Sequence, residues 1–154
     1  MKRLSNLLAA LVFASLVIFM SCGGGGSDPG PSELEIAIDN LTVSGGFSNP
    51  SNVKTDNGQP DGVWDTFGIT FTGNVANQGG SYKVSNVPNG FSDVWADGTW
   101  TINNAGDEIT KIQGGVTTVM TAGIEDGELS LEFDVDDPSG RTNGIGGTWL
   151  FVFK

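Results

Sequence analysis

The chain has 154 residues, of which 18 are acidic and 7 are basic, so its formal net charge is −11 at pH 7. It contains no histidine and one cysteine, which excludes Ser-His-Asp and Cys-His catalytic groups, histidine-ligated zinc or haem, and a disulfide within one chain. So acidic a protein is also unsuited to nucleic acid, whose phosphates are bound by Lys and Arg. The remaining catalytic candidates are carboxylates, hydroxyls, lysines and Tyr82.

Residues 1–21 have the three parts of a secretory signal peptide. Lys2 and Arg3 form a basic start, and an apolar stretch over 7–20 follows. This stretch is shorter than the roughly 20 residues that a membrane-spanning helix needs. Ser21 provides the small residue that precedes a cleavage site, so we expect the chain to be exported.

The end of this segment, Phe19-Met20-Ser21-Cys22, resembles a lipobox, the site that lipoprotein signal peptidase cleaves once the cysteine carries a diacylglyceryl group. Many lipoboxes have Leu where this chain has Phe19. The resemblance implies lipidation of Cys22 and a stable membrane anchor of two or three acyl chains. Because Gly23 is not an inner-membrane retention signal, it also implies the outer membrane or the cell surface. Residues 22–32 then form a flexible Gly/Ser/Pro tether.

From residue 33 to 154 the composition fits one domain, and apolar residues alternate with polar ones between frequent turn residues. This pattern is typical of an antiparallel sandwich or barrel. Leu34, Ile36 and Ile38 predict a first strand. Residues 44–62 lack clear alternation and predict a long loop.

Further strands are predicted in chain order, about eight in all, at 67–71, 81–84, 95–102, 108–112, 116–121, 129–135 and 148–153. In the strand at 129–135, Leu129, Leu131 and Phe133 face one side while Ser130 and Glu132 face the other. We therefore predict an all-β fold, an up-and-down barrel of about eight strands, with a β-sandwich as the alternative.

Residues 63–154 are similar to the lipocalin-like domains of bacterial surface lipoproteins. The likeness lies in the segments DVWADGTWTI at 93–102, EIT at 108–110, LSLEF at 129–133 and GTWLFVF at 147–153. Those domains usually open with Gly-x-Trp, which this chain lacks near Leu34. The resemblance implies an eight-stranded meander, and most such domains have no established ligand.

Three aromatic residues, Trp64, Phe91 and Trp95, lie beside Gly, Asn and Asp turns and are the candidate ligand-binding residues. Their rings could stack on a glycan or cover a small hydrophobic ligand. The competing interpretation is that they cap the core, because large aromatic side chains dominate burial in small domains. The bulky inward positions predict a mostly filled interior, so we expect binding only at the mouth of the barrel.

Acidic groups supply two further hypotheses. Acidic groups such as Asp93 and Asp97, or the cluster Glu125, Asp126 and Glu128, could serve a glycosidase, and residues 134–140 faintly resemble a calcium loop. Eighteen acids produce such pairs freely, and turns favour Asp, so we expect neither catalysis nor a metal or other cofactor.

Together these observations predict a monomeric, lipid-anchored extracytoplasmic lipoprotein with a binding or structural role and no catalytic activity. The alternative is a carbohydrate-binding β-sandwich module that assists polysaccharide uptake.

Overall fold

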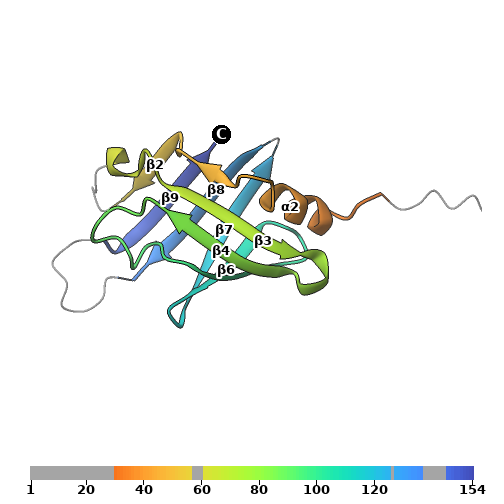
Figure 1. Ribbon diagram of the computed structural model, residues 1–154. Helices are drawn as coiled ribbons and strands as arrows, with labels where there is room; N and C mark the ends of the chain where they lie inside the picture. Colours follow the sequence, from red (N-terminus) through yellow and green to blue (C-terminus); the bar gives the residue numbers. More distant parts are fainter. Residues whose placement is uncertain (1–29, 57–60, 126, 137–144) are drawn as a thin grey trace, which may run out of the picture. The chain divides into compact units, whose positions relative to one another are not determined.

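Alternating apolar residues place the strands of this chain in one curled antiparallel sheet of nine strands, in the order β1-β3-β4-β5-β6-β7-β8-β9-β2. The computed structural model describes residues 30–56, 61–125, 127–136 and 145–154. Cys22, the signal peptide and most of the tether lie outside the described residues. Figure 1 shows β3 and β4 crossing in front of β7, β8 and β9 as the sheet curls. The predicted all-β, barrel-like fold is therefore confirmed.

The strands are β1 (Phe47–Ser48), β2 (Asn52–Thr55), β3 (Gly68–Asn74), β4 (Gly79–Ser85), β5 (Gly98–Ile102), β6 (Glu108–Gln113), β7 (Val116–Glu125), β8 (Glu128–Val135) and β9 (Gly147–Phe153). The helices are α2 (Glu33–Leu41) and the 3-10 turns η1 (Asp61–Trp64) and η2 (Val75–Asn77). From β3 to β9 each strand pairs with the next one along the chain, which is an up-and-down arrangement. All described strands belong to this one sheet, so the two-sheet sandwich does not form.

The two edges of the sheet are joined through a single segment. β1 pairs with β3 and β2 pairs with β9, although only three residues separate β1 from β2 along the chain. Between them the Asn49 N–H donates to the Phe67 carbonyl at 2.9 Å, and the Ser51 N–H donates to the Val152 carbonyl at 2.7 Å. The long loop predicted over 44–62 is therefore wrong in part. Each of these edge strands has one buried apolar residue, too few to produce visible alternation.

The first predicted strand is also wrong, because residues 33–41 form α2. Ser32 caps this helix: its hydroxyl accepts from the Glu35 N–H at 3.2 Å, and the Glu35 carboxylate accepts from the Ser32 N–H at 2.7 Å. This capping box satisfies backbone donors that a helix start otherwise leaves unpaired. The buried residues Ala37, Ile38 and Leu41 follow helical spacing, while Ile36 is exposed. Ser32, assigned to the tether from the sequence, therefore takes part in the folded domain.

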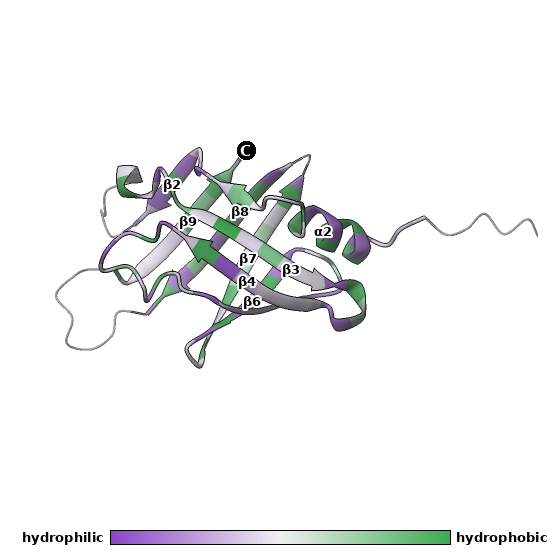
Figure 2. Ribbon diagram, in the orientation of Figure 1, coloured by the Kyte–Doolittle hydropathy of each residue, from purple (hydrophilic) through white to green (hydrophobic). Residues whose placement is uncertain are grey.

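A core rich in aromatic residues fills the curl of the sheet. The fully buried side chains include all four tryptophans, and further buried residues alternate along the strands, among them Phe67, Ile69, Phe71, Leu131, Phe133, Phe151 and Phe153. Figure 2 shows hydrophobic and hydrophilic residues interleaved along the strands and on α2. The interior is packed with the chain's own side chains in this region.

The two ends of the barrel differ. The helix α2 packs against β3, β7 and η2, and its Ala37 side chain lies beside Gly106 in the β5–β6 turn. This end therefore carries the β3–β4 and β5–β6 turns and is covered by the helix. The β4–β5 and β6–β7 connections lie at the opposite end, because consecutive strands run in opposite directions. The cavity described next is at that opposite end.

Candidate functional site

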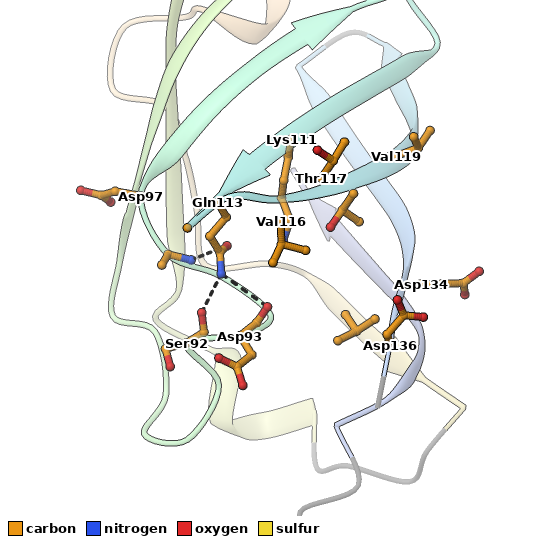
Figure 3. Close-up of a pocket in the computed structure, with 14 residues that line it drawn as sticks. Ser92, Asp93, Asp97, Lys111, Gln113, Val116, Thr117, Val119, Asp134 and Asp136 are labelled. Atoms are coloured by element: carbon orange, nitrogen blue, oxygen red, sulfur yellow. Dashed lines mark hydrogen bonds between the residues drawn. The ribbon is translucent and has the colours of Figure 1, made fainter. Parts of the chain in front are cut away.

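A cavity of about 890 Å³ opens between the β6–β7 hairpin, the β4–β5 connection and the end of β8 (Figure 3). Its size lies within the range of roughly 300–1,000 Å³ that is typical of small-molecule sites. The lining combines apolar side chains such as Ala96, Val116 and Val135 with polar ones. The barrel thus has a packed interior and one roomy, partly open mouth.

The hairpin that forms one wall is built around two glycines. Gln113 and Val116 are a cross-strand pair, so only Gly114 and Gly115 connect β6 to β7. Both glycines have positive φ, at 57° and 85°, which matches the tight two-residue turns that fit the twist of a hairpin. Val116 follows the turn at the rim of the cavity and is 66% exposed.

The cavity exists because β7 and β8 separate before either strand ends. Their pairing runs from Glu125 and Glu128 to Met120 and Phe133. Beyond that point, within the described residues, β7 pairs with β6 alone, and β8 continues to Val135 paired with β9 alone. The sheet therefore has a break at the mouth, and the pair Met120 and Phe133 marks the closed end of this break.

Lys111 lies at the bottom of the cavity and is 2% exposed. Among the described residues it is the one charged residue that is buried. Its inward direction follows from the alternation of β6, in which Ile109 is also buried and Ile112 is exposed. The Lys111 ammonium group donates a hydrogen bond to the Val94 carbonyl. Within the described residues it forms no ion pair.

Aromatic rings surround the charge of Lys111. The Nζ atom lies 4.2 Å from the Trp95 ring centroid and 4.7 Å from that of Phe133. The electron-rich faces of the rings attract a cation. Burial nevertheless lowers the pKa of Lys111 to about 7, because the charged form is separated from water. At neutral pH this amine is therefore close to its titration midpoint.

Gln113 holds the β4–β5 connection over Lys111. Its side-chain oxygen accepts from the Ala96 N–H at 2.8 Å, and its side-chain nitrogen donates to the Ser92 carbonyl at 2.7 Å and the Asp93 carbonyl at 3.4 Å (Figure 3). These bonds fix the wall that carries Val94, the acceptor of the Lys111 hydrogen bond. The position of the Lys111 ammonium group therefore depends on Gln113, the next inward residue of β6.

Four carboxylates lie around the cavity, at Asp93, Asp97, Asp134 and Asp136. Asp97 accepts from the Val84 N–H at 2.9 Å, and Asp134 accepts from the Thr148 hydroxyl at 2.7 Å. Figure 3 shows the side chains of Asp97 and Asp134 directed outward. Asp93 and Asp136 stand on opposite walls, so the mouth is acidic around a buried cation.

The three aromatic residues predicted from the sequence lie within or against the core. Trp64 is 0% and Trp95 is 1% exposed, and Phe91 is half-buried. The Trp64 ring centroid lies 5.2 Å from that of Phe91, in an edge-to-face arrangement. Trp95 packs edge-on against Phe133 at 5.3 Å. None of the three lines the cavity directly, but Trp95 lies behind Lys111 and forms part of its surroundings.

Sequence reasoning missed Lys111 and Gln113. The signal was present, because Ile109, Lys111 and Gln113 share one face of the strand predicted at 108–112 and its continuation. Two polar residues at inward positions at the end of a strand indicate that the core ends there. The predicted strand at 95–102 begins only at Gly98, because Val94 and Trp95 form a turn with N–H groups donating to the Phe91 carbonyl.

Over the described ranges of the chain, the arrangement of side chains adds no support to the hypotheses based on acidic residues. Among the described residues no group of three or more Cys, Asp or Glu side chains could hold a metal ion. Asp137 of the resemblance to a calcium loop, and Asp126 of a second acidic cluster, lie outside the described residues. In the part of the chain that is described, no helix is long and apolar enough to cross a membrane.

Comparison with known proteins gives no assignment: no protein family, no curated protein and no solved structure matches the chain significantly.

Proposed function

We propose that this chain is a lipid-anchored lipoprotein of the outer membrane or cell surface, without catalytic activity, that binds a small ligand in the cavity at the mouth of a lipocalin-like barrel. The observation that carries the binding role is the cavity of about 890 Å³ at the end of an otherwise packed core. A purely structural domain has no need for such an opening. Its buried cation, Lys111, would supply one specific polar contact among apolar walls.

The anchor rests on Cys22 and the signal peptide that precedes it. Two or three acyl chains on this cysteine would hold the protein stably at a membrane. The acidic domain would then present its cavity to the extracytoplasmic space as a monomer.

The glycan hypothesis depended on rings that are open to solvent. Trp64 and Trp95 have no exposed face on which a sugar could stack, and both indole N–H groups are buried without a hydrogen-bond partner among the described residues. The cavity therefore favours a ligand with apolar and charged groups over one recognised by aromatic stacking.

Binding can be tested with the full chain in phosphatidylcholine nanodiscs, labelled with 5-fluorotryptophan. The probes are amino acids, peptides of two to six residues, carboxylates of four to eight carbons and oligosaccharides. A ligand in the cavity should shift the fluorine resonance of Trp95, assigned by Trp95→Phe.

Two variants locate the binding. Thr118→Phe places a ring in the cavity opposite Lys111, its cross-strand partner, and should prevent the shift. The matched control Thr101→Phe adds the same ring at an exposed position of β5 and should leave the shift intact. If no probe moves the Trp95 signal, or if Thr118→Phe binds as well as the wild type, the proposal is wrong.

A further inference from the structure

Lys111 has more hydrogen-bond donors than the hydrogen bond it makes within the fold requires. A lysine ammonium group has three N–H donors, and one donates to the Val94 carbonyl. No carboxylate of the described residues pairs with this buried cation. A buried charge without a counter-ion is unfavourable unless a partner arrives. The cavity floor is thus suited to a carboxylate that enters from the mouth.

The ammonium group of Lys111 lies close to the point where β7 and β8 separate. Its Nζ atom lies 4.7 Å from the ring centroid of Phe133, and Phe133 with Met120 forms the last β7–β8 pair before the strands separate. Lys111 therefore stands at the closed end of the break. A ligand that enters the break from the mouth would therefore place its innermost end beside the ammonium group.

Among the described residues, the side of the break formed by β7 is a strand edge without a pairing partner. The Ala122 N–H donates to the Asp107 carbonyl at 2.8 Å, toward β6. Because backbone groups of an antiparallel strand point to alternate sides, those of Thr117 and Val119 point toward β8. If pairing continued in register, their partners would be Asp136 and Asp134. An edge of this kind is a template for an added strand.

The surroundings define the side chains of the added strand. Val116 and Val119 are 66% and 54% exposed, so the edge offers apolar contacts. Asp136 lies at the opening, and the chain carries a net charge of −11. An anion alone would be repelled by this field, whereas a chain with basic side chains and one terminal carboxylate complements both the rim and the floor.

We propose that the break between β7 and β8 binds an extended basic peptide, whose C-terminal carboxylate pairs with Lys111 and whose backbone adds to the edge of β7. The peptide runs from the mouth inward, parallel to β7 and antiparallel to β8, because its C-terminus lies at the closed end. Its basic side chains face the acidic rim that includes Asp136. This inference rests on the proposed function and names the ligand class of the same cavity.

The direct test compares two forms of one peptide. The probe is a hexapeptide in which lysine and valine alternate, labelled with fluorescein at its N-terminus and synthesised with either a free or an amidated C-terminus. Fluorescence anisotropy with the full chain in phosphatidylcholine nanodiscs measures affinity, with empty nanodiscs as the blank. We expect the free acid to bind at least tenfold more tightly than the amide.

Variants then assign the contact to Lys111. Lys111→Met keeps the length of the side chain without its charge and should bring the affinity for the free acid down to that for the amide. Lys83→Met removes an exposed lysine of β4 and should leave the tenfold difference unchanged. The acid-to-amide comparison on the wild type needs no variant, so it stands even where Lys111→Met alters stability.

Backbone pairing is tested on the ligand. N-methylation removes an amide donor, so methylation of alternate residues should abolish binding for the set that faces β7 and spare the set that faces away. Equal affinity of acid and amide, or tolerance of both methylated sets, would overturn the inference. If no peptide binds but another probe shifts the Trp95 resonance and is blocked by Thr118→Phe, the cavity still binds a ligand and only the peptide inference fails. If neither occurs, both proposals fail.

Discussion

The Nζ atom of Lys111 lies 4.2 Å from the centroid of the Trp95 ring. This contact makes Trp95, which the sequence suggested as a ligand-binding ring, a partner of a buried charge. The attraction between a cation and an aromatic ring is about 0.5–2 kcal/mol, which offsets only part of the free energy lost when an ammonium group leaves water. The lowered pKa of Lys111, about 7, is the consequence of that imbalance.

The first prediction follows from this pKa. An unfolded lysine titrates near 10.4, so between about pH 7 and pH 10 the unfolded chain binds more protons than the folded one. Stability should therefore rise with pH across this window, with a slope of up to about 1.4 kcal/mol per pH unit. Below pH 7 both states are charged and the slope should vanish. Urea unfolding of the wild type at pH 6, 8 and 9 measures the effect.

Lys111→Met should remove this slope, since methionine does not titrate. Its free energy of unfolding at pH 6 should exceed that of the wild type, and the two should converge as the pH rises toward 10. Lys83→Met, at an exposed position, should retain the wild-type slope. Parallel pH profiles for the wild type and Lys111→Met would show that Lys111 has an ordinary pKa.

The second prediction concerns Tyr82, whose hydroxyl is buried without a hydrogen-bond partner among the described residues. Burial, with a smaller contribution from the charge of Asp97, raises the pKa of Tyr82 to about 12. An unpaired buried polar group costs about 1–3 kcal/mol, so Tyr82→Phe should increase the free energy of unfolding by about 1 kcal/mol. Chemical denaturation at pH 7 measures the change.

Thr148→Val is a matched control of opposite sign. It removes a hydroxyl that donates to Asp134 at 2.7 Å, so it should destabilise the domain by about 0.5–1.5 kcal/mol. A loss of stability in Tyr82→Phe comparable with that in Thr148→Val would mean that the tyrosine hydroxyl has a partner in solution.

The third prediction separates a helix from the strand expected over residues 34–38. Ser32→Ala removes the side chain that caps α2 and should destabilise the domain by about 1 kcal/mol. Ser44→Ala, at an exposed position after the helix, should change little. Thermal unfolding of the full chain distinguishes the two, and an unchanged midpoint for Ser32→Ala would contradict the capping box.

The fourth prediction concerns the anchor. Cells that express the full chain and are fed an alkyne fatty acid should label the protein and retain it in the membrane fraction. Cys22→Ser should abolish the label, because it removes the sulfur that would accept the lipid. Ser21→Ala, which keeps a small residue before the cysteine, should still be labelled. Label that persists in Cys22→Ser would rule out this cysteine as the anchor.

The parts of the fold that were predictable from the sequence are the strands in which buried apolar residues alternate with exposed polar residues over many positions. Leu129, Leu131 and Phe133 alternate with polar neighbours, and all three are buried as predicted. The segment at 33–41 misled because Leu34, Ile36 and Ile38 alternate as well, and the helical spacing of Ala37, Ile38 and Leu41 was overlooked. The capping residues Ser32 and Glu35 were the local signal that could have decided between the two.

The site was less predictable than the fold, because it depends on where pairing stops. No residue pattern in β7 or β8 indicates that the two strands separate beyond the pair Met120 and Phe133. The sequence pointed to Trp64, Phe91 and Trp95, none of which lines the cavity. The burial of these rings and the position of Lys111 depend on how the β4–β5 connection folds back. That path is set by hydrogen bonds from Gln113 to residues about twenty positions away, which are not visible in the sequence.

The segment from β1 to β2, which pairs with both edges of the sheet, also orders the events of folding. Ser51 and Val152 are hydrogen-bonded across 101 positions of sequence, whereas the pairs from β3 to β9 join strands that are neighbours along the chain. Contacts so distant in sequence form slowly, because the loop between them must close first. The meander can therefore assemble while the barrel is still open, and closure waits for β9. Until that step, the folding chain exposes two unpaired strand edges, and this is the stage at which it is most prone to pair with another copy.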